Sequence, residues 1–180
     1  MTDDIDLDRR WETMFFGICR SCRYHQYRRA FFNRLSRTSS IASVVFGSTA
    51  FVGVLQGERA QILALWASAG LVCLATVNVV FNSAVRARDH RDFMRRYVEL
   101  EKRMLQPVSE ELLMSITVDR LSIEADEPPT LHVLNSICHN EQLRAVSGYT
   151  VEEYSTISPL QRLFSQFFDY RENIIKKSAE

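Results

Sequence analysis

Two long stretches without a charged residue constrain this chain more than any other feature of its sequence. The first runs from Thr38 to Gly57 and the second from Ala60 to Val85, so they contain 20 and 26 residues, separated only by Glu58 and Arg59. An α-helix needs about 20 apolar residues to cross a hydrocarbon core of about 30 Å. We therefore expect a two-helix transmembrane hairpin, with spans at about 38–57 and 60–85.

The distribution of charge supports this interpretation and predicts an orientation. Segment Met1–Arg37 has eight Arg against five acidic residues, and Arg86–Arg103 has seven basic against four acidic residues, so each carries +3. Met104–Glu180 has six basic and twelve acidic residues, and the whole chain has no net charge. Lys and Arg near membrane-spanning ends stay cytoplasmic, so we expect both termini in the cytoplasm. The alternative is a soluble helical hairpin in a large core, which 180 residues could scarcely cover.

Helical periodicity continues outside the two spans, which predicts an all-α fold. Apolar residues recur every three or four positions before the first span (Trp11, Phe15, Ile18, Cys22) and after the second (Phe93, Tyr97, Leu100, Met104). We expect two continuous helices of about 45 residues each, the second ending at Pro107. The predicted segments are an N-terminal amphipathic helix (1–37), the hairpin (38–85), a cytoplasmic stalk and helical region (86–148), and a C-terminal amphipathic helix (149–180).

Three short motifs predict where the later helices begin. Ser109 can cap one helix, and Asp126-Glu-Pro-Pro129 is typical of the start of a second, ending near Gly148. Ser158-Pro159-Leu160-Gln161 has the spacing of a capping box. The final helix is expected to repeat apolar residues and to end in two lysines (Leu160, Leu163, Phe164, Phe167, Ile174; Lys176, Lys177).

Polar residues inside the spans are the first candidates for function, because hydrocarbon makes them costly unless they are paired or face water. Ser39 and Ser43 open the first span, and Asn78 and Asn82 close the second, at the same depth of an antiparallel hairpin. One interpretation is packing between the helices, worth under about 2 kcal/mol per contact. The other is a polar pore lining formed by several copies. These residues alone favour packing.

Candidate chemistry outside the spans is sparse. Cys19, Cys22 and His25, with Cys138 and His139, have ligand types that bind zinc, but cysteines on a helix face usually pack as small apolar residues. The acidic cluster Glu124, Asp126, Glu127 and the run His139-Asn140-Glu141 could bind a metal, transfer protons or sense a ligand. Helix capping and ion pairs with the basic stalk (Arg88, Arg91, Arg95, Arg96) are the simpler explanation.

No nucleophile, glycine-rich phosphate loop or HExxH motif accompanies these residues. We therefore expect no enzyme activity, no cofactor and no resident metal. The topology alone explains the basic residues that flank the spans. Alternatively, these residues bind anionic lipid head groups, at about 1 kcal/mol for each Lys or Arg. They do not support nucleic-acid binding.

Four runs, in this order, resemble the SLATT family of two-transmembrane effector domains: Arg23–Phe32 before the first span, Arg91–Arg103 after the second, Arg120–Pro129 and Cys138–Glu141. The resemblance covers roughly Arg9 to Gly148. Its motif positions are Arg28, Arg29, Phe31, Glu124, Glu127, Pro128, His139, Asn140 and Glu141.

The resemblance implies a pore-forming or membrane-disrupting effector of the bacterial inner membrane, in an anti-phage nucleotide-signalling system. Such a protein would form a homo-oligomer in the lipid bilayer and respond to a nucleotide second messenger or a separately encoded signalling partner. We expect Glu124, Glu127, His139, Asn140 and Glu141 to take part in sensing or in contacts between helices. The alternative is a membrane-anchored scaffold that recruits a cytosolic partner without forming a pore. A weaker third hypothesis is an enzyme at the membrane surface.

Overall fold

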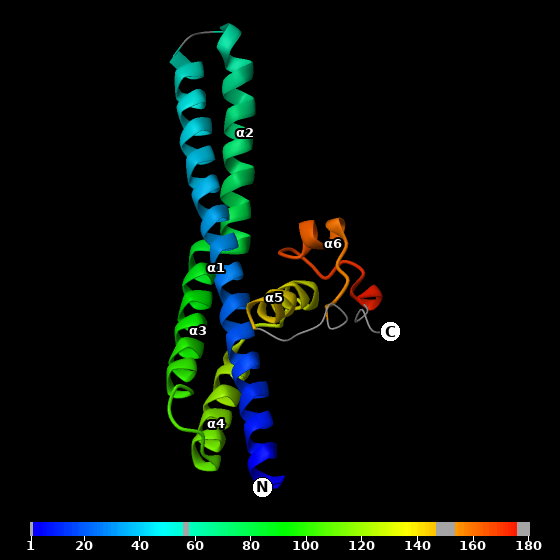
Figure 1. Cartoon of the computed structure of the whole chain (residues 1–180). Coiled ribbons are helices and arrows are strands. Elements are labelled where there is room, and N and C mark those ends of the chain that lie inside the picture. Colours follow the sequence, from blue (N-terminus) through cyan, green and yellow to red (C-terminus); the bar gives the residue numbers. More distant parts are fainter. Residues whose placement is uncertain (1, 56–57, 147–153, 176–180) are drawn as a thin grey trace. The chain divides into compact units, whose positions relative to one another are not determined.

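The described residues form helices and no β-strand, which confirms the all-α class (Figure 1). The computed structural model describes residues 2–55, 58–146 and 154–175. Its helices are α1 (Thr2–Leu55), α2 (Glu58–Phe81), α3 (Ser83–Arg103), α4 (Glu110–Asp126), α5 (His132–Ala145), α6 (Pro159–Phe164) and the 3-10 turn η2 (Glu172–Ile174). The chain divides into a hairpin unit, Arg29–Asp89, and a core unit made of Met1–Arg28 with His90–Glu180.

In the hairpin unit, the second half of α1 and α2 run antiparallel, side by side (Figure 1). Close contacts fix their register. A Cβ added to Gly53 would lie 2.7 Å from the Cβ of Ala64, and one added to Gly70 would lie 3.4 Å from the ring of Phe46. Small residues dominate the facing sides, so the backbones approach closely. The buried or partly buried positions of the pair include Ser39, Ala42, Ser43, Phe46, Gly47, Ala50 and Gly53 on α1 and Ala60, Ala64, Ala67, Gly70, Leu71, Leu74 and Asn78 on α2.

The outer faces of the same two helices carry large apolar side chains. Trp66 is 72% exposed and Val79 is 81% exposed, and the others include Ile41, Val44, Val45, Phe51, Val54, Ile62, Leu63 and Leu65. One described helical stretch, Ala60–Arg103, is long and apolar enough to cross a membrane by length and composition, with a mean hydropathy of 2.0 in its most apolar part. The first span, which holds six Ser and Thr between Thr38 and Thr49, stays a prediction.

A single residue interrupts the second long helix. The prediction of one continuous helix from the second span to Pro107 is wrong, because α2 ends at Phe81 and α3 begins at Ser83. Asn82 between them has a φ of 43°. Asn adopts this left-handed conformation more readily than other residues with a Cβ. The backbone hydrogen bonds resume at once, from the Val85 and Arg86 N–H groups to the Asn82 carbonyl. The first long helix is continuous, as expected.

The core unit packs α3 and α4 against the first part of α1 around one apolar cluster. The fully or almost fully buried members are Ile18, Tyr97, Leu100, Met104, Ile116 and Ile123, and Trp11, Phe15, Cys22 and Phe93 pack against them. The apolar stripes predicted on both sides of the spans therefore meet in this core. Ion pairs at the edge join α3 to α4, from Arg96 to Asp126 at 2.8 Å and from Arg103 to Asp119.

Local sequence motifs predicted two of the later helix starts correctly and a third one wrongly. The Ser109 hydroxyl accepts a hydrogen bond from the Leu112 N–H, and Ser158 and Gln161 form the complete capping box. Asp126-Glu-Pro-Pro129 does not start a helix. Asp126 is the last residue of α4, Glu127 caps the end of that helix, and α5 begins only at His132.

The prediction of a final amphipathic helix is also wrong, since α6 ends at Phe164. Turns follow it, and Arg171 has a φ of 51° directly before η2. Aromatic rings of Phe164, Phe168 and Tyr170 pack together in this segment. The predicted basic end at Lys176 and Lys177, and the predicted end near Gly148, lie outside the described residues.

Candidate functional site

A polar pocket of about 330 Å³ lies in the core unit, between the first part of α1, α3, α4 and the linker that leads to α5. Its walls combine charged and flat side chains. They are Arg20, Ser21, Tyr24, His25, Tyr97, Arg120, Glu124, Glu127, Pro128, Pro129, Thr130 and Asn135. Most of these residues come from two helix faces and the Pro128–Thr130 linker, so the pocket depends on the linker being extended rather than helical.

Two arginines of the pocket have different surroundings. Arg120 donates from Nε to the Glu124 carboxylate at 2.7 Å, one turn further along α4. Its guanidinium lies over Gly17, where an added Cβ would be 3.1 Å from Nη1, so the missing side chain makes room for it. The Nε atom of Arg20 is buried and has no hydrogen-bond partner among the described residues, while the Glu124 carboxylate attracts the charge of this arginine. Burial, and next the nearby Arg120 charge, lower the pKa of Arg20.

A chain of three side chains runs from the pocket wall into the interior. The Nε2 atom of His25 lies 3.0 Å from the Glu127 Oε1 atom, and its Nδ1 atom lies 3.0 Å from Nδ1 of His90. A carboxylate can only accept, so Nε2 of His25 donates to Glu127. When His25 is neutral, its Nδ1 then accepts the Nδ1–H of His90. His25 is only 1% exposed, and each ring nitrogen has a partner.

Aromatic side chains enclose this chain of polar groups. The His25 ring stacks on Tyr97 with centroids 5.7 Å apart, and it also contacts Tyr24 and Phe93. Burial, together with the Glu127 carboxylate, raises the pKa of Tyr97 well above its usual value. The Tyr24 hydroxyl accepts the Leu131 N–H at 3.0 Å and so holds the linker at its α5 end. Burial raises the pKa of Tyr24 as well. The side chains at this end of the pocket are therefore buried.

The structure places the predicted sensing residues in two different regions. Glu124 and Glu127 line the pocket. His139, Asn140 and Glu141 lie further along α5 and do not line it. The His139 ring contacts Phe16, Asn140 exchanges two hydrogen bonds with the Ser155 backbone, and Glu141 accepts from the Tyr27 hydroxyl at 2.6 Å. The run at 139–141 therefore joins α5 to α1 and to the segment around Ser155.

The polar residues predicted inside the spans differ from one another in how far they are buried. Ser39 is buried and Ser43 is partly buried between α1 and α2, as the packing interpretation expects. Asn78 is partly buried on the same interface of α2, and the register brings it to the level of Ser39. Asn82 is exposed and forms the helix break.

Sequence reasoning missed Arg20, Arg120 and His90 as members of a site. A signal for the histidine pair was present, because His25 continues the apolar stripe three residues after Cys22 and His90 precedes Phe93 by three. A polar residue on a core stripe indicates a buried partner. No comparable signal marks Arg20, since arginines recur along the same segment of the sequence, at positions 9, 10, 23, 28 and 29.

The cysteines do not form a zinc site with His25, whose two ring nitrogens are already bonded to His90 and Glu127. All four cysteines are free thiols. Burial, followed by the Glu101 charge, raises the pKa of Cys19 to about 11 and that of Cys22 to about 12. Burial also raises the pKa of Cys138 to about 12. These are the properties of thiols that pack as apolar groups.

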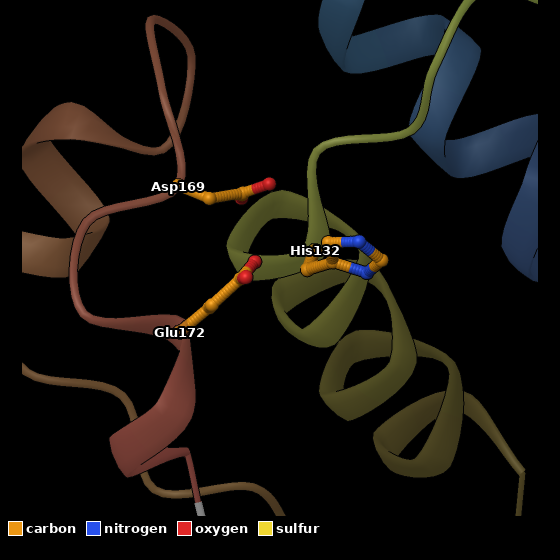
Figure 2. A group of neighbouring side chains, drawn as sticks. All are labelled: His132, Asp169 and Glu172. Carbon is orange, nitrogen blue, oxygen red and sulfur yellow. The ribbon is translucent and has the colours of Figure 1, made fainter.

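A second cluster joins α5 to the C-terminal segment. His132, Asp169 and Glu172 each bring a possible ligand atom within 4.8 Å of the others, and Figure 2 shows both carboxylates directed toward the histidine. Asp169 already accepts the Val133 N–H at 2.9 Å, at the first turn of α5. Carboxylates are favoured at the positive end of a helix dipole, so capping of α5 accounts for their position.

Comparisons with protein-family models, with curated proteins and with solved structures gave no match for this chain. The pocket and the hairpin unit are therefore interpreted from their own geometry.

Proposed function

We propose that this protein is a membrane effector: its hairpin unit inserts in a bilayer, and several copies assemble to permeabilise it. The proposal places both termini on the cytoplasmic side of a bacterial inner membrane. The SLATT-like order of the sequence motifs agrees with this function.

The arrangement of side chains in the hairpin unit is the observation that carries the proposal. Mostly small residues, with Phe46, Leu71 and Leu74, are buried or partly buried along α1 and α2, while large apolar side chains such as Trp66, Phe51 and Val79 face outward. A water-soluble helix pair has the opposite arrangement, because exposing large apolar groups to water costs about 25 cal/mol per Å². Small residues inside and large apolar residues outside are typical of helices that pack within lipid.

The exposed hydroxyl groups of the hairpin unit support the same environment. Thr49 donates to the Val45 carbonyl at 2.9 Å, Thr76 to the Val72 carbonyl at 3.0 Å, and Ser40 to the Ser36 carbonyl at 2.9 Å. Each hydroxyl therefore finds its hydrogen-bond acceptor, a backbone carbonyl, within its own helix. In hydrocarbon an unsatisfied hydroxyl would cost several kcal/mol, so these bonds make a lipid-facing position tolerable.

One hairpin cannot enclose a channel, so permeabilisation requires several copies. Asn78 is the candidate for the polar lining, because a polar amide at this depth is costly unless it is paired or faces water. Opening would require rotation of α2 away from Ser39. The core unit supplies the sensing element, and its pocket is the candidate site for the trigger.

The test is dye leakage from liposomes that contain the purified protein, compared between native protein and Asn78→Leu. We expect the substitution to reduce leakage at least about tenfold while assembly, measured by cross-linking, persists. Thr76→Val is the matched control, because its hydroxyl is exposed but already bonded within the helix, and it should leak like the native protein. Asn82 is unsuitable for this test, since leucine there would also disturb the left-handed backbone.

The scaffold alternative gives a different result in the same experiment. A scaffold leaves the liposomes intact at every protein concentration, and Asn78→Leu then changes nothing. If native protein never causes leakage, even after candidate triggers are added, the effector proposal is wrong.

A further inference from the structure

We infer that His132, Asp169 and Glu172 bind a divalent transition-metal ion, for which zinc is the best fit, and that this ion fastens the C-terminal segment to the start of α5. The inference goes beyond the proposed function and does not depend on it. Sequence reasoning weighed none of these three residues and expected no resident metal, because the histidine lies far from the two carboxylates along the chain.

The geometry of the three side chains is the first observation. Each brings one possible ligand atom within 4.8 Å of the others, and Figure 2 shows the two carboxylates directed toward the histidine from a neighbouring segment. Zinc holds nitrogen and oxygen ligands at about 2.0–2.2 Å, so two ligand atoms of a tetrahedral site lie about 3.4 Å apart. The three atoms are thus close to the spacing of a metal site, and small rotations of the side chains bring them to it.

Two of the three side chains have no other bond that would oppose such a rotation. Within the part of the chain that the structure describes, neither the His132 ring nor the Glu172 carboxylate has a hydrogen bond or an ion pair, and both are exposed. Helix capping explains why carboxylates lie at the start of α5. However, the bond from the Val133 N–H to Oδ1 of Asp169 uses only one of their four oxygen atoms. A metal ion would give the remaining donor atoms a partner.

A neighbouring arginine does not neutralise the two carboxylates. Arg171 lies between them in the sequence, but its guanidinium is placed over the Tyr170 ring, with Cζ 5.8 Å from the ring centroid. Among the described residues, Arg171 forms no ion pair with Asp169 or Glu172. Two like charges at this spacing repel each other. A divalent cation between them cancels both charges.

The backbone that carries the carboxylates is held in place on both sides. Asp169 is tied to the first turn of α5 through Val133, and the buried Gln161 side chain of α6 donates from Nε2 to the Arg171 carbonyl at 3.0 Å. The carboxylates therefore keep their place relative to His132, the first residue of α5. A preformed arrangement of this kind loses less conformational entropy when its ligand binds.

The donor types select among metals. Imidazole nitrogen suits zinc and the neighbouring transition metals, whereas magnesium and calcium prefer sites made of oxygen atoms. Three protein ligands leave a fourth position, which water occupies in many zinc sites. Zinc also binds more tightly than manganese or iron(II) to a given set of ligands. Zinc is therefore the probe and magnesium the comparison.

The test is isothermal titration of zinc chloride into the full chain, purified in a non-ionic detergent without a polyhistidine tag and freed of metal with a chelator. We expect a single zinc ion per chain, bound at least about tenfold more tightly than magnesium. Glu172→Gln should weaken zinc binding at least about tenfold, because even groups that only hydrogen-bond to a ligand contribute about that much. Zinc should also raise the melting temperature of the native protein more than that of Glu172→Gln.

A second variant separates metal binding from helix capping. Asp169→Asn keeps an oxygen that can accept the Val133 N–H but loses the charge. It should therefore lose zinc affinity, while its melting temperature without metal stays close to that of the native protein. Glu111→Gln is the control, since Glu111 is an exposed carboxylate on α4, and it should bind zinc like the native protein.

Three results would overturn the inference. Absence of zinc binding by the native protein would reject the site directly. Native-like zinc binding by Glu172→Gln and Asp169→Asn would mean that other residues hold the ion. Binding of magnesium as tightly as zinc would mean that the histidine is not a ligand.

Discussion

Single residues of the core unit show that its interior combines apolar packing with a few buried polar groups, some paired and some not. His25 and Tyr97 are both within the core, at 1% and 0% exposure. His25 meets Glu127 and His90, so its burial leaves neither ring nitrogen unpaired. The Arg20 Nε atom and the Tyr97 hydroxyl differ, because each is buried without a hydrogen-bond partner among the described residues.

The buried thiols predict how stability depends on alkaline pH. Burial raises the pKa of Cys22 and Cys138 from 9.0 to about 12 in the folded protein. Above pH 9 the unfolded chain therefore releases these protons while the folded chain retains them. Since the unfolded state then binds fewer protons, the free energy of unfolding falls as pH rises from about 9 toward 12. The contribution is fully present below pH 9.

Thermal unfolding in detergent, followed by circular dichroism from pH 7 to pH 11, checks this prediction. The melting temperature should be steady near pH 8 and decline above pH 9. Cys138→Ala should make the decline shallower, because one of the linked protons is removed, although the variant is less stable at every pH. An equally steep decline in Cys138→Ala would show that this thiol does not contribute.

Residue identities in the site were predictable only in part. Glu124 and Glu127 were expected to sense a ligand, and they do line the pocket. His139, Asn140 and Glu141 were grouped with them but lie elsewhere on α5, because a sequence run does not show which helix faces which. The partner of His25 comes from α3, 65 residues away, and local patterns cannot specify such a contact.

At the scale of elements, the α1–α2 pair predicts a sharp difference between two glycines of α1. A Cβ at Gly53 would lie 2.7 Å from the Ala64 Cβ and 3.0 Å from the Ala60 carbonyl oxygen, whereas one at Gly47 meets nothing within 4 Å. Gly53→Ala should therefore push the helices apart and cost about 1–3 kcal/mol. Gly47→Ala should be neutral or stabilising by up to about 1 kcal/mol, from helix propensity alone.

Both variants are purified in a mild detergent and then unfolded with increasing amounts of a denaturing detergent. Helix content is the signal, and it gives the difference in the free energy of unfolding between the two variants. Because the two substitutions are chemically identical and lie on the same helix, only the local packing separates them. Equal stabilities for the two variants would contradict the described register of α1 and α2.

Element boundaries were predictable where their cause is local. The caps at Ser109 and Ser158 were predicted because each depends on residues three positions apart. The break at Asn82 was missed because asparagine is compatible with a helix as well as with a left-handed φ. The delay of α5 to His132 was missed because the extended linker is held by a distant contact, the hydrogen bond from Leu131 to Tyr24.

At the scale of the whole molecule, large apolar side chains are exposed along both helices of the hairpin unit. Trp66 and Val79 on α2 are examples, although Phe32 of the same unit is buried. The core unit buries Ile18, Tyr97 and Ile116 and has its ion pairs at the edge. Under the proposed function, lipid would cover the exposed apolar side chains of the hairpin unit, and water would surround the core unit.

The native cysteines offer a direct test of this division. Cys73 lies in the middle of α2 and is exposed, while Cys22 and Cys138 lie in the core unit with pKa values raised to about 12. If lipid surrounds α2, a charged maleimide in opened membrane vesicles should label Cys73 at least about tenfold more slowly than a water-exposed thiol, because the reagent does not enter hydrocarbon. Asp92→Cys supplies that reference, since Asp92 is exposed on α3 in the core unit.

Peptide mass spectrometry gives the labelled fraction at each position over time, and denaturation with sodium dodecyl sulfate should then expose Cys73. The comparison does not depend on pore formation, on oligomerisation or on a trigger. Shielding of Cys73 with rapid labelling of Asp92→Cys would place α2 in lipid whether the protein acts as a pore or as a scaffold. Equally rapid labelling at both positions would mean that water reaches the middle of α2, and it would contradict the placement of this helix in lipid.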